Sequence, residues 1–566
     1  MVLPFWKKEI SSIHAAAFLI GAAGFLSRIL GLFRDRLLAS HYGASRTLDI
    51  YYASFQIPDF LYTLFLIGAA SAAILPTFIS IWERDKKKAE EFIGGLLIIF
   101  SLAAALVSLI VAIFAPFIVR LVAPGFDPAS RALMITMTRI MMISPIFLGV
   151  SNIFSSVIQA NRQFIVFALT SILYNLGIII GILAFVPVFG PQGLAYGVIL
   201  GAFLHMAVQI PALGALSFRP QFLSFKKIPE IKNVFLVSIP RVAALSLDQI
   251  ISVMLVALAS TLAAGSVAVF RLADNLRFIP VGIFGVSYSV AGFSRLAEHA
   301  AKKSKEGFFE DLSALIESIL FWVVPLACFL LILRAHVVRL ALGAGHFSWV
   351  DTRLTAATLA ILAFAIIGES LATLFIRSFY AIGNTKLPFF TSLFTTVFVI
   401  GLAPFLLTLF TTHRASGKLI ADLLKVGDLH DVGVLGLALA FALGDLLDLI
   451  FLWVALSRES KKYFGGGGIP LKTLASGLKI IFASIAATFI GYGVLYLLSL
   501  YIPLDTFLHV LLQGGATFMV AAAFYTGIMY MLGSEQVNAF IEPFRRRLIK
   551  PAILPQEIDE DRAAFR

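Results

Sequence analysis

The chain has 566 residues, of which 60% are hydrophobic and only 13% are charged, and its mean hydropathy is +0.95. So few charged residues could not cover the surface of a water-soluble globular protein, which excludes soluble enzymes and soluble binding modules. The formal net charge of +12 does not indicate nucleic acid as a partner, because the basic residues are divided among separate loops.

Apolar runs long enough to cross a hydrocarbon layer of roughly 30 Å recur along the whole chain. They predict an all-α polytopic membrane protein with about fourteen transmembrane helices. In chain order we expect them at residues 14–38, 50–81, 92–122, 132–159, 164–188, 191–216, 231–259, 266–298, 312–342, 353–381, 386–411, 432–457, 472–500 and 506–533. A cleaved signal peptide is the alternative for the first run, but Arg28, Arg34 and Arg36 follow it directly, so we expect a retained helix.

Positive charge alternates between the loops. Basic residues gather at 86–88, 226–227, 302–305, 461–462 and 545–547, whereas the opposite loops carry almost none outside 412–431. This is the positive-inside pattern, and it places both termini in the cytoplasm. Attraction to anionic membrane lipids is a secondary effect of the same residues.

A weak internal repeat divides the chain. Short groups of residues recur in the same order and spacing in the two halves, among them Ala160, Thr170 and Ser171 with Ala381, Thr391 and Ser392. Repeated halves are typical of a carrier that binds cargo between two lobes and rocks them to alternate access. We therefore predict two pseudo-symmetric six-helix lobes plus two C-terminal helices. The expected boundaries are 1–216 for the N-terminal lobe, 217–230 for a cytoplasmic linker, 231–457 for the C-terminal lobe, 458–471 for a glycine-rich cytoplasmic linker, 472–533 for the two additional helices and 534–566 for a cytoplasmic tail.

The motifs of membrane enzymes are missing from the sequence. The single cysteine, Cys328, excludes a disulfide framework and a cysteine metal site. There is no Walker loop, no His-Glu-x-x-His and no Gly-x-Ser-x-Gly. A glycosyl or prenyl transferase would need a paired-carboxylate metal site, so we expect a transporter with no cofactor and no catalytic residue.

Ionisable side chains inside hydrocarbon are costly, so those that remain usually face a cavity or one another. Arg28 and Arg34 in the first span are candidate ligands for an anion such as phosphate. The alternative is that Arg34 and Arg36 extend to the lipid headgroups, which is the interpretation we favour for Arg36.

Two acidic residues occupy near-equivalent positions in the repeat. Asp59 and Asp274 are expected on the inner face of their lobes, and Arg271 and Asn275 share one side of the eighth span. The alternative to a role in substrate binding is a local Arg–Asp pair that only stabilises the eighth span.

Four further carboxylates lie at or near membrane depth in the second half. Asp248, Glu369, Asp445 and Asp448 could bind Na⁺ or exchange protons and so couple transport to an ion gradient. Equally, they could pair with hydroxyl or amide groups of neighbouring helices.

Several motifs in order resemble the MurJ (MviN) family of lipid II flippases, within the multidrug/oligosaccharidyl-lipid/polysaccharide exporter superfamily. They are "SRILGLFRD" from Ser27, "YGAS" from Tyr42, Asp49, "SFQIPDFL" from Ser54, "GAASAAILPTF" from Gly68, "APGF" from Ala123, "LADNLRFIPVGIFGV" from Leu272, "GAGHF" from Gly343, "FYAIGNTKLP" from Phe379 and "GLALA" from Gly436. The resemblance covers most of residues 15–457 and agrees with the count of fourteen spans.

The resemblance implies a V-shaped pair of lobes around a cationic cavity, with the last two helices forming an apolar groove for a lipid tail. It implies transport of lipid II, an undecaprenyl-pyrophosphate-linked disaccharide pentapeptide, from the inner to the outer leaflet of the bacterial cytoplasmic membrane for peptidoglycan synthesis. Expected partners are lipid II, membrane lipids and the cell-wall synthesis machinery. Positions important for transport in the family fall here on Arg28, Arg34 and Asp49.

The chain departs from the family pattern at four positions. Tyr62, Thr63 and Asn275 stand where the family usually has arginines, and Ile67 replaces a glutamate. This predicts a less cationic cavity, in which Arg271 lies one helical turn from Asn275.

The expected mechanism follows from the headgroup, which cannot cross hydrocarbon unaided. Arg28, Arg34 and Arg271 would hold the pyrophosphate, and acidic residues at 49, 59 and 274 would orient them or meet sugar hydroxyls. The membrane potential could reorient a cationic site. A polysaccharide-lipid flippase, a cation-coupled drug exporter of the same superfamily and a non-transporting scaffold for cell-wall enzymes remain alternatives.

Overall fold

A computed structural model of the chain describes residues 13–63, 74–221, 246–412, 415–429 and 431–538. Its regular elements in these ranges are helices, and each of the fourteen predicted spans contains at least one. Ten helical segments are long and apolar enough to cross a membrane, and Ser246–Ser260 is a shorter apolar helix. The predicted all-α membrane fold class is confirmed. Ile67, most of the linker 217–230 and most of the tail 534–566 lie outside the described residues.

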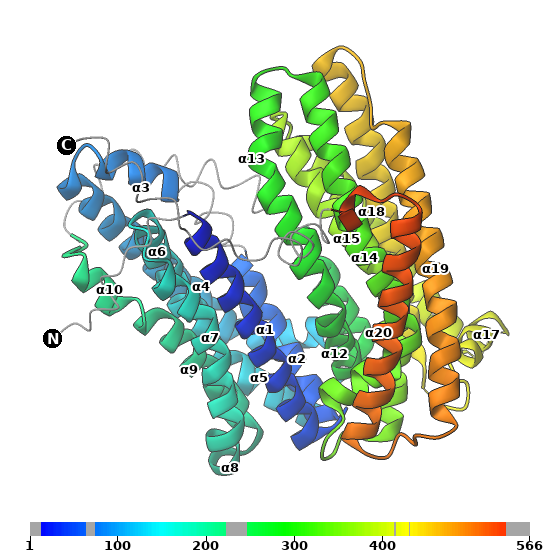
Figure 1. Cartoon of the computed structure of the whole chain (residues 1–566). Helices are drawn as coiled ribbons and strands as arrows, with labels where there is room; N and C mark the ends of the chain where they lie inside the picture. Colours follow the sequence, from blue (N-terminus) through cyan, green and yellow to red (C-terminus); the bar gives the residue numbers. More distant parts are fainter. Residues whose placement is uncertain (1–12, 64–73, 222–245, 413–414, 430, 539–566) are drawn as a thin grey trace, which may run out of the picture.

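The first group of helices, α1 to α10, forms the N-terminal lobe (Figure 1). Ser45, Asp85 and Asp127 begin α2, α4 and α5 by accepting hydrogen bonds from backbone N–H groups of the first turn. The bounds are α1 Ile13–Tyr42, α2 Arg46–Tyr62, α3 Leu75–Trp82, α4 Lys86–Val122, α5 Pro128–Met141, α6 Ser144–Ala160, α7 Phe164–Ile180, the π-helix η4 Gly181–Phe185, α8 Val186–Phe189, the short 3-10 helix η5 Gly190–Gln192, α9 Gly193–Ala207 and α10 Ile210–Ala215.

Glycines let two helices of this lobe touch along their backbones. A Cβ on Gly177 of α7 would overlap the Cα of Gly201 in α9, and a Cβ on Gly181 would overlap the Cα of Gly197. Small residues at such a seam are the usual device for close helix packing in membranes, where no hydrophobic effect drives the helices together. Through these contacts α7 and α9 form one closely packed pair.

The second group of helices forms the C-terminal lobe (Figure 1). Pro280 ends α12, and the chain continues through a π-helical segment into α13, so Ser266–Ala301 forms one interrupted rod. The bounds are Ser246–Ser260, α12 Ser266–Pro280, the π-helix η7 Val281–Val286, α13 Ser287–Ala301, α14 Lys305–Leu342, α15 Trp349–Ala381, α16 Lys386–Thr411, α17 Ala415–Leu423 and α18 Gly433–Phe464.

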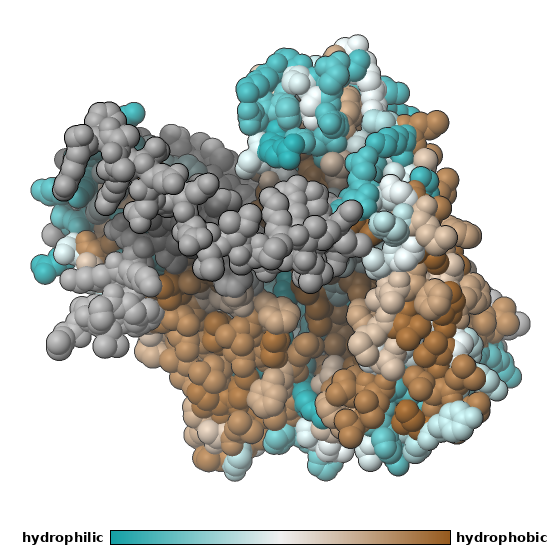
Figure 2. Space-filling model, viewed as in Figure 1, coloured by the Kyte–Doolittle hydropathy of each residue, from teal (hydrophilic) through white to brown (hydrophobic). Residues whose placement is uncertain are grey.

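Two more helices, α19 (Leu471–Ser499) and α20 (Phe507–Met531), pack against each other and against α14. They share with α14 a separate apolar core that contains Phe321, Ala487 and Tyr525. Figure 1 shows them on the outer flank of the C-terminal lobe. Figure 2 shows mostly apolar side chains over the lower part of both lobes, as expected for a surface in contact with lipid.

The two lobes meet at one end, which we call the closed end, and separate toward the other (Figure 1). Residues 40–49 and 123–127 of the N-terminal lobe face residues 260–268 and 340–351 of the C-terminal lobe there. The backbone N–H of His346 donates to the Ser40 carbonyl at 2.9 Å, and the Gly125 N–H donates to the Ser260 hydroxyl at 3.1 Å. The largest apolar core joins both lobes at this end, with Phe126 and Phe347 among its fully buried side chains. The other end is therefore the open one.

Candidate functional site

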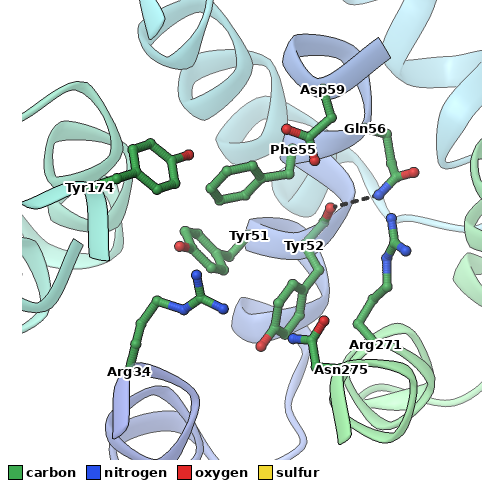
Figure 3. A pocket seen from close by; sticks show the side chains of 9 residues that line it. All are labelled: Arg34, Tyr51, Tyr52, Phe55, Gln56, Asp59, Tyr174, Arg271 and Asn275. Atoms are coloured by element: carbon green, nitrogen blue, oxygen red, sulfur yellow. Dashed lines mark hydrogen bonds between the residues drawn. The ribbon is translucent and has the colours of Figure 1, made fainter. Parts of the chain in front are cut away.

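A polar cavity of about 260 Å³ lies between the two lobes. Its lining comes from α1, α2 and α7 of one lobe and from α12 of the other (Figure 3). The lining residues are Arg34, Tyr51, Tyr52, Phe55, Gln56, Asp59, Tyr174, Arg271 and Asn275. The spacing of Tyr52, Gln56 and Asp59 places them on one face of α2, which points into this space.

Four of the residues predicted from the sequence meet here: Arg34, Asp59, Arg271 and Asn275. Arg34 and Asp59 come from the N-terminal lobe, and the other two are one turn apart on α12. Within the described ranges, Asp59 forms no hydrogen bond and no ion pair.

Arg34 belongs to a network that crosses from one lobe to the other. Its Nε and Nη2 donate to Oδ1 of Asp35 at 2.9 and 2.8 Å, and its Nη1 donates to Oδ1 of Asn175 in α7 at 3.2 Å. Asp35 is only 3% exposed, and its other oxygen accepts from Nδ2 of Asn275 at 3.0 Å. Asn275, where the resemblance implied an arginine, thus binds the carboxylate that neutralises Arg34. Sequence reasoning did not select Asp35, although its place between two arginines was a signal.

Arg271 begins a second interlobe chain. Its Nη2 donates to the Ser252 hydroxyl at 2.8 Å, and that hydroxyl donates to Oε1 of Gln56 in α2 at 2.9 Å. The amide of Gln56 also donates to the Tyr52 carbonyl at 3.4 Å, which is the dashed line in Figure 3. Nη1 of Arg271 lies 3.8 Å from Asp274.

Three other predicted residues lie outside the lining of the cavity. Arg28 crosses from α1 to the opposite lobe, where its guanidinium lies 5.7 Å from the ring centre of Phe278 and against the backbone of Gly282. Asp49 is fully buried at the closed end, where it accepts hydrogen bonds from the N–H groups of Gly265 at 2.7 Å and Ala268 at 2.9 Å. In the structure both carboxylate oxygens of Asp49 thus cap the first turn of α12.

Asp274 faces a separate cluster inside the C-terminal lobe. Arg277, which is 3% exposed, donates to Oδ1 of Asp274 at 2.9 and 2.8 Å. It also pairs with Glu369 and lies 3.6 Å from Asp445. Arg277, which the sequence analysis did not select as a candidate, is the centre of this cluster.

The remaining predicted carboxylates border the same cluster. Asp448 accepts a hydrogen bond from the Thr395 hydroxyl at 3.1 Å, and Asp248 is close enough to Glu369 and Asp448 to repel them. In the part of the chain that the structure describes, no three acidic, histidine or cysteine side chains converge as metal ligands would.

A second cavity, of about 570 Å³, is almost wholly apolar. It lies between α2, α4 and the helix Ser246–Ser260, and Gln56 lines both cavities. At Tyr62 and Thr63, where the resemblance implied arginines, neither side chain supplies a cation. The Tyr62 hydroxyl accepts from Nδ2 of Asn152 at 3.1 Å.

Comparison with known proteins places this geometry in context. The family model described as lipid II flippase MurJ matches residues 38–513. A probable lipid II flippase MurJ of Thermotoga maritima is 32% identical over 380 residues, which cover 67% of this chain and 76% of the relative. Another of Bdellovibrio bacteriovorus is 26% identical and covers 94% of this chain and 97% of the relative.

Solved structures show the same fold. A lipid II flippase MurJ in an inward closed conformation superposes with a TM-score of 0.72 at 24% identity, covering 91% of this chain and 99% of that one. An inward-facing multidrug resistance transporter of the MATE family gives a TM-score of 0.62 at 16% identity, covering 77% of this chain and 95% of that one.

Proposed function

The chain belongs to the MurJ family of lipid II flippases, and we propose on that premise that it moves lipid II across the bacterial cytoplasmic membrane for peptidoglycan synthesis. It is a multi-pass membrane transporter and not an enzyme. The observation that supports the proposal most directly is a polar cavity between two lobes that, over the described residues, meet at the closed end and separate toward the other.

The direction of transport follows from the loop charges. The basic loops at 86–88, 302–305 and 461–462 adjoin the helix ends farthest from the closed end. The positive-inside rule assigns those loops, and with them both termini, to the cytoplasm. In this orientation the cavity opens to the cytoplasm, where lipid II is received, and the closed end must part to release it to the outer leaflet.

The lipid tail can remain in the membrane during this exchange. We propose that it lies along α19 and α20, as the family resemblance implies. Phe482 and Phe489 of α19 and Met519 of α20 present exposed apolar side chains that suit a hydrocarbon chain. The headgroup alone then passes through the polar cavity.

Coupling to a cation is proposed for the cluster around Arg277. One guanidinium faces Asp274, Glu369 and Asp445, so the carboxylates outnumber it, and Asp248 adds to the excess. A proton or a sodium ion bound there would reduce the excess negative charge inside the membrane. Transport in proteoliposomes with an imposed sodium gradient or pH gradient tests this, and a rate that is indifferent to both gradients and to membrane potential would contradict it.

Flipping itself is tested with the purified full chain in proteoliposomes that contain labelled lipid II, and by rescue of a strain depleted of its own flippase. We expect Arg34→Ala and Arg271→Ala to reduce both readouts strongly. Arg139→Ala is the matched control, because Arg139 donates to the Ala112 carbonyl within the N-terminal lobe and does not line the cavity. Full rescue by the Arg34/Arg271 double variant, or movement of a drug or polysaccharide-linked lipid instead of lipid II, would refute the proposal.

A further inference from the structure

The apolar cavity beside the polar one takes no part in the proposed path of the headgroup. Its volume of about 570 Å³ falls in the range of sites that hold small organic ligands. Among the described residues that line it, Gln56 is the only one with a polar side chain, and the others are aliphatic, aromatic or, at Met254, a thioether. A charged or sugar-containing ligand would find a single amide to bind on these walls, so the cavity suits hydrocarbon.

The cavity is open to the surrounding membrane. Leu121 and Ile250 in its lining are 70% and 40% exposed, whereas Ile57 and Val122 are 7% and 4% exposed. One wall is the membrane span α4, so acyl chains of the bilayer can enter the cavity without crossing water. Empty space of this size would leave the lining without contacting atoms, and an apolar cavity does not hold water. The hydrocarbon that surrounds the protein here is the acyl chain of a phospholipid.

The walls come from both lobes, directly beneath the closed end. Helices α2 and α4 supply one side, and the helix Ser246–Ser260 supplies the other. Val122 and Ala257 each line the cavity three residues before a contact of the closed end. In that contact the Gly125 N–H donates to the Ser260 hydroxyl at 3.1 Å. When the closed end parts, these walls must separate, so the cavity is complete only in the conformation described here.

Gln56 places the cavity in contact with the hydrogen bonds that join the lobes. Its Oε1 accepts from the Ser252 hydroxyl at 2.9 Å, and the same hydroxyl accepts from Arg271 at 2.8 Å. Figure 3 shows the Gln56 amide close to the Arg271 guanidinium. A hydrocarbon chain against Gln56 would keep water away from these hydrogen bonds, which are stronger where the local dielectric is low.

We propose that this cavity binds one acyl chain of a membrane phospholipid and that the bound chain contacts both lobes. In the orientation given by the loop charges, the site lies in the outer half of the membrane, next to the closed end. A ligand favours the state that it binds better, so the chain stabilises the conformation in which the two walls face each other. The lining residues belong neither to α19 nor to α20, which we assigned to the polyprenyl tail. This inference therefore goes beyond lipid II transport and does not depend on the cargo.

The test is photocrosslinking of the purified full chain in nanodiscs of phosphatidylethanolamine and phosphatidylglycerol, without lipid II. A small fraction of the phosphatidylethanolamine carries a diazirine at the end of one acyl chain, and adducts are mapped by peptide mass spectrometry. We expect adducts on both 111–122 and 250–257 that saturate as the fraction of probe rises. Adducts that grow in proportion to that fraction, as contacts with bulk lipid do, would overturn the proposal.

Two variants fill the cavity from opposite walls. Val111→Trp in α4 and Ala257→Trp in the other lobe each put an indole ring where the chain would lie, so the saturable adducts should be lost. Leu102→Trp is the matched control and should retain them, because Leu102 is 67% exposed on α4 and does not line the cavity. Saturable adducts that persist in both filled variants would count against a site in this cavity.

A locked chain tests the contact with both lobes. In a Ser40→Cys/His346→Cys variant, with Cys328 replaced by serine, a disulfide can hold the closed end shut, because the His346 N–H donates to the Ser40 carbonyl at 2.9 Å. The oxidised chain should keep the saturable adducts on both walls, and their loss on oxidation would overturn the assignment to this conformation. Displacement of the probe by undecaprenyl phosphate would also overturn it, since the cavity would then belong to the polyprenyl tail. Failure of the wild-type chain to flip lipid II would leave these results unchanged and refute only the proposed function.

Discussion

Substitution of Asp49 at the closed end provides a direct test of alternating access. Its carboxylate is fully buried, and it joins the lobes because it belongs to α2 and accepts from the N–H groups of Gly265 and Ala268 in the first turn of α12. When the lobes part at this end, both hydrogen bonds must break. Asp49 therefore stabilises only the conformation described here.

The size of this effect can be worked from the contacts. Hydrogen bonds to a charged group contribute about 1.5–3 kcal/mol each, and loss of a helix cap costs about 0.5–2 kcal/mol. When the closed end opens, hydrogen bonds to water replace part of this lost stabilisation. We therefore expect Asp49→Ala to favour the opened conformation by about 2–3 kcal/mol, or roughly 30- to 150-fold in the equilibrium constant. Asp49→Asn keeps one acceptor oxygen and should give a smaller shift.

Distances between spin labels measure this equilibrium. With Cys328 replaced by serine, labels at the exposed positions His41 and Thr261 report on opposite lobes next to the closed end. Asp49→Ala should add a population with a longer separation. Asp428→Asn is the control, because the pair between Asp428 and Arg353 lies within one lobe. Unchanged distances in Asp49→Ala would refute the idea that this cap holds the lobes together.

Three further outcomes are expected. Arg277→Gln leaves buried carboxylates without their cation and should lower the free energy of unfolding by about 3–5 kcal/mol, with partial recovery on adding Glu369→Gln, as thermal unfolding in detergent would measure. Gly177→Ala forces a Cβ into the α7–α9 seam and should cost about 1–3 kcal/mol in the same assay, whereas Gly214→Ala, with nothing within 4 Å of the added Cβ, should not. Asn275→Leu removes the hydrogen bond to the acidic residue of α1 and should slow lipid II flipping, whereas Asn275→Arg keeps a donor there and should not. Equal stability of the two glycine variants, or equal rates for the two asparagine variants, would contradict the respective assignment.

Helical spacing explains how much of the site could be predicted. Arg271 and Asn275 were expected on one side of a helix, and both face the cavity. Helical spacing also places Asp274 and Arg277 on a different face of α12 from Arg271 and Asn275. It does not predict which helices pack against that other face. Here it meets α15 and α18, which bring the carboxylates that surround Arg277.

Contacts between distant segments were harder to predict. The role of Asp49 depends on the approach of α2 to the start of α12, more than two hundred residues later. The apolar runs predicted the helices well, because burial in lipid leaves a clear signal in every span. Which helix ends meet across the two lobes leaves no comparable signal in a single sequence.

The backbone contact between α7 and α9 has a mechanical consequence. With Gly177 against Gly201 and Gly181 against Gly197, the two helices leave no room for a side chain between them. We expect such a closely packed pair to tilt together, so that long helices of the lobe act as levers. Helix α4 has 37 residues, or about 55 Å, so a tilt of about 10° at one extremity would carry the other by roughly 10 Å. If the closed end is the extremity that moves, breaking its few hydrogen bonds would let the lobes part there by this distance.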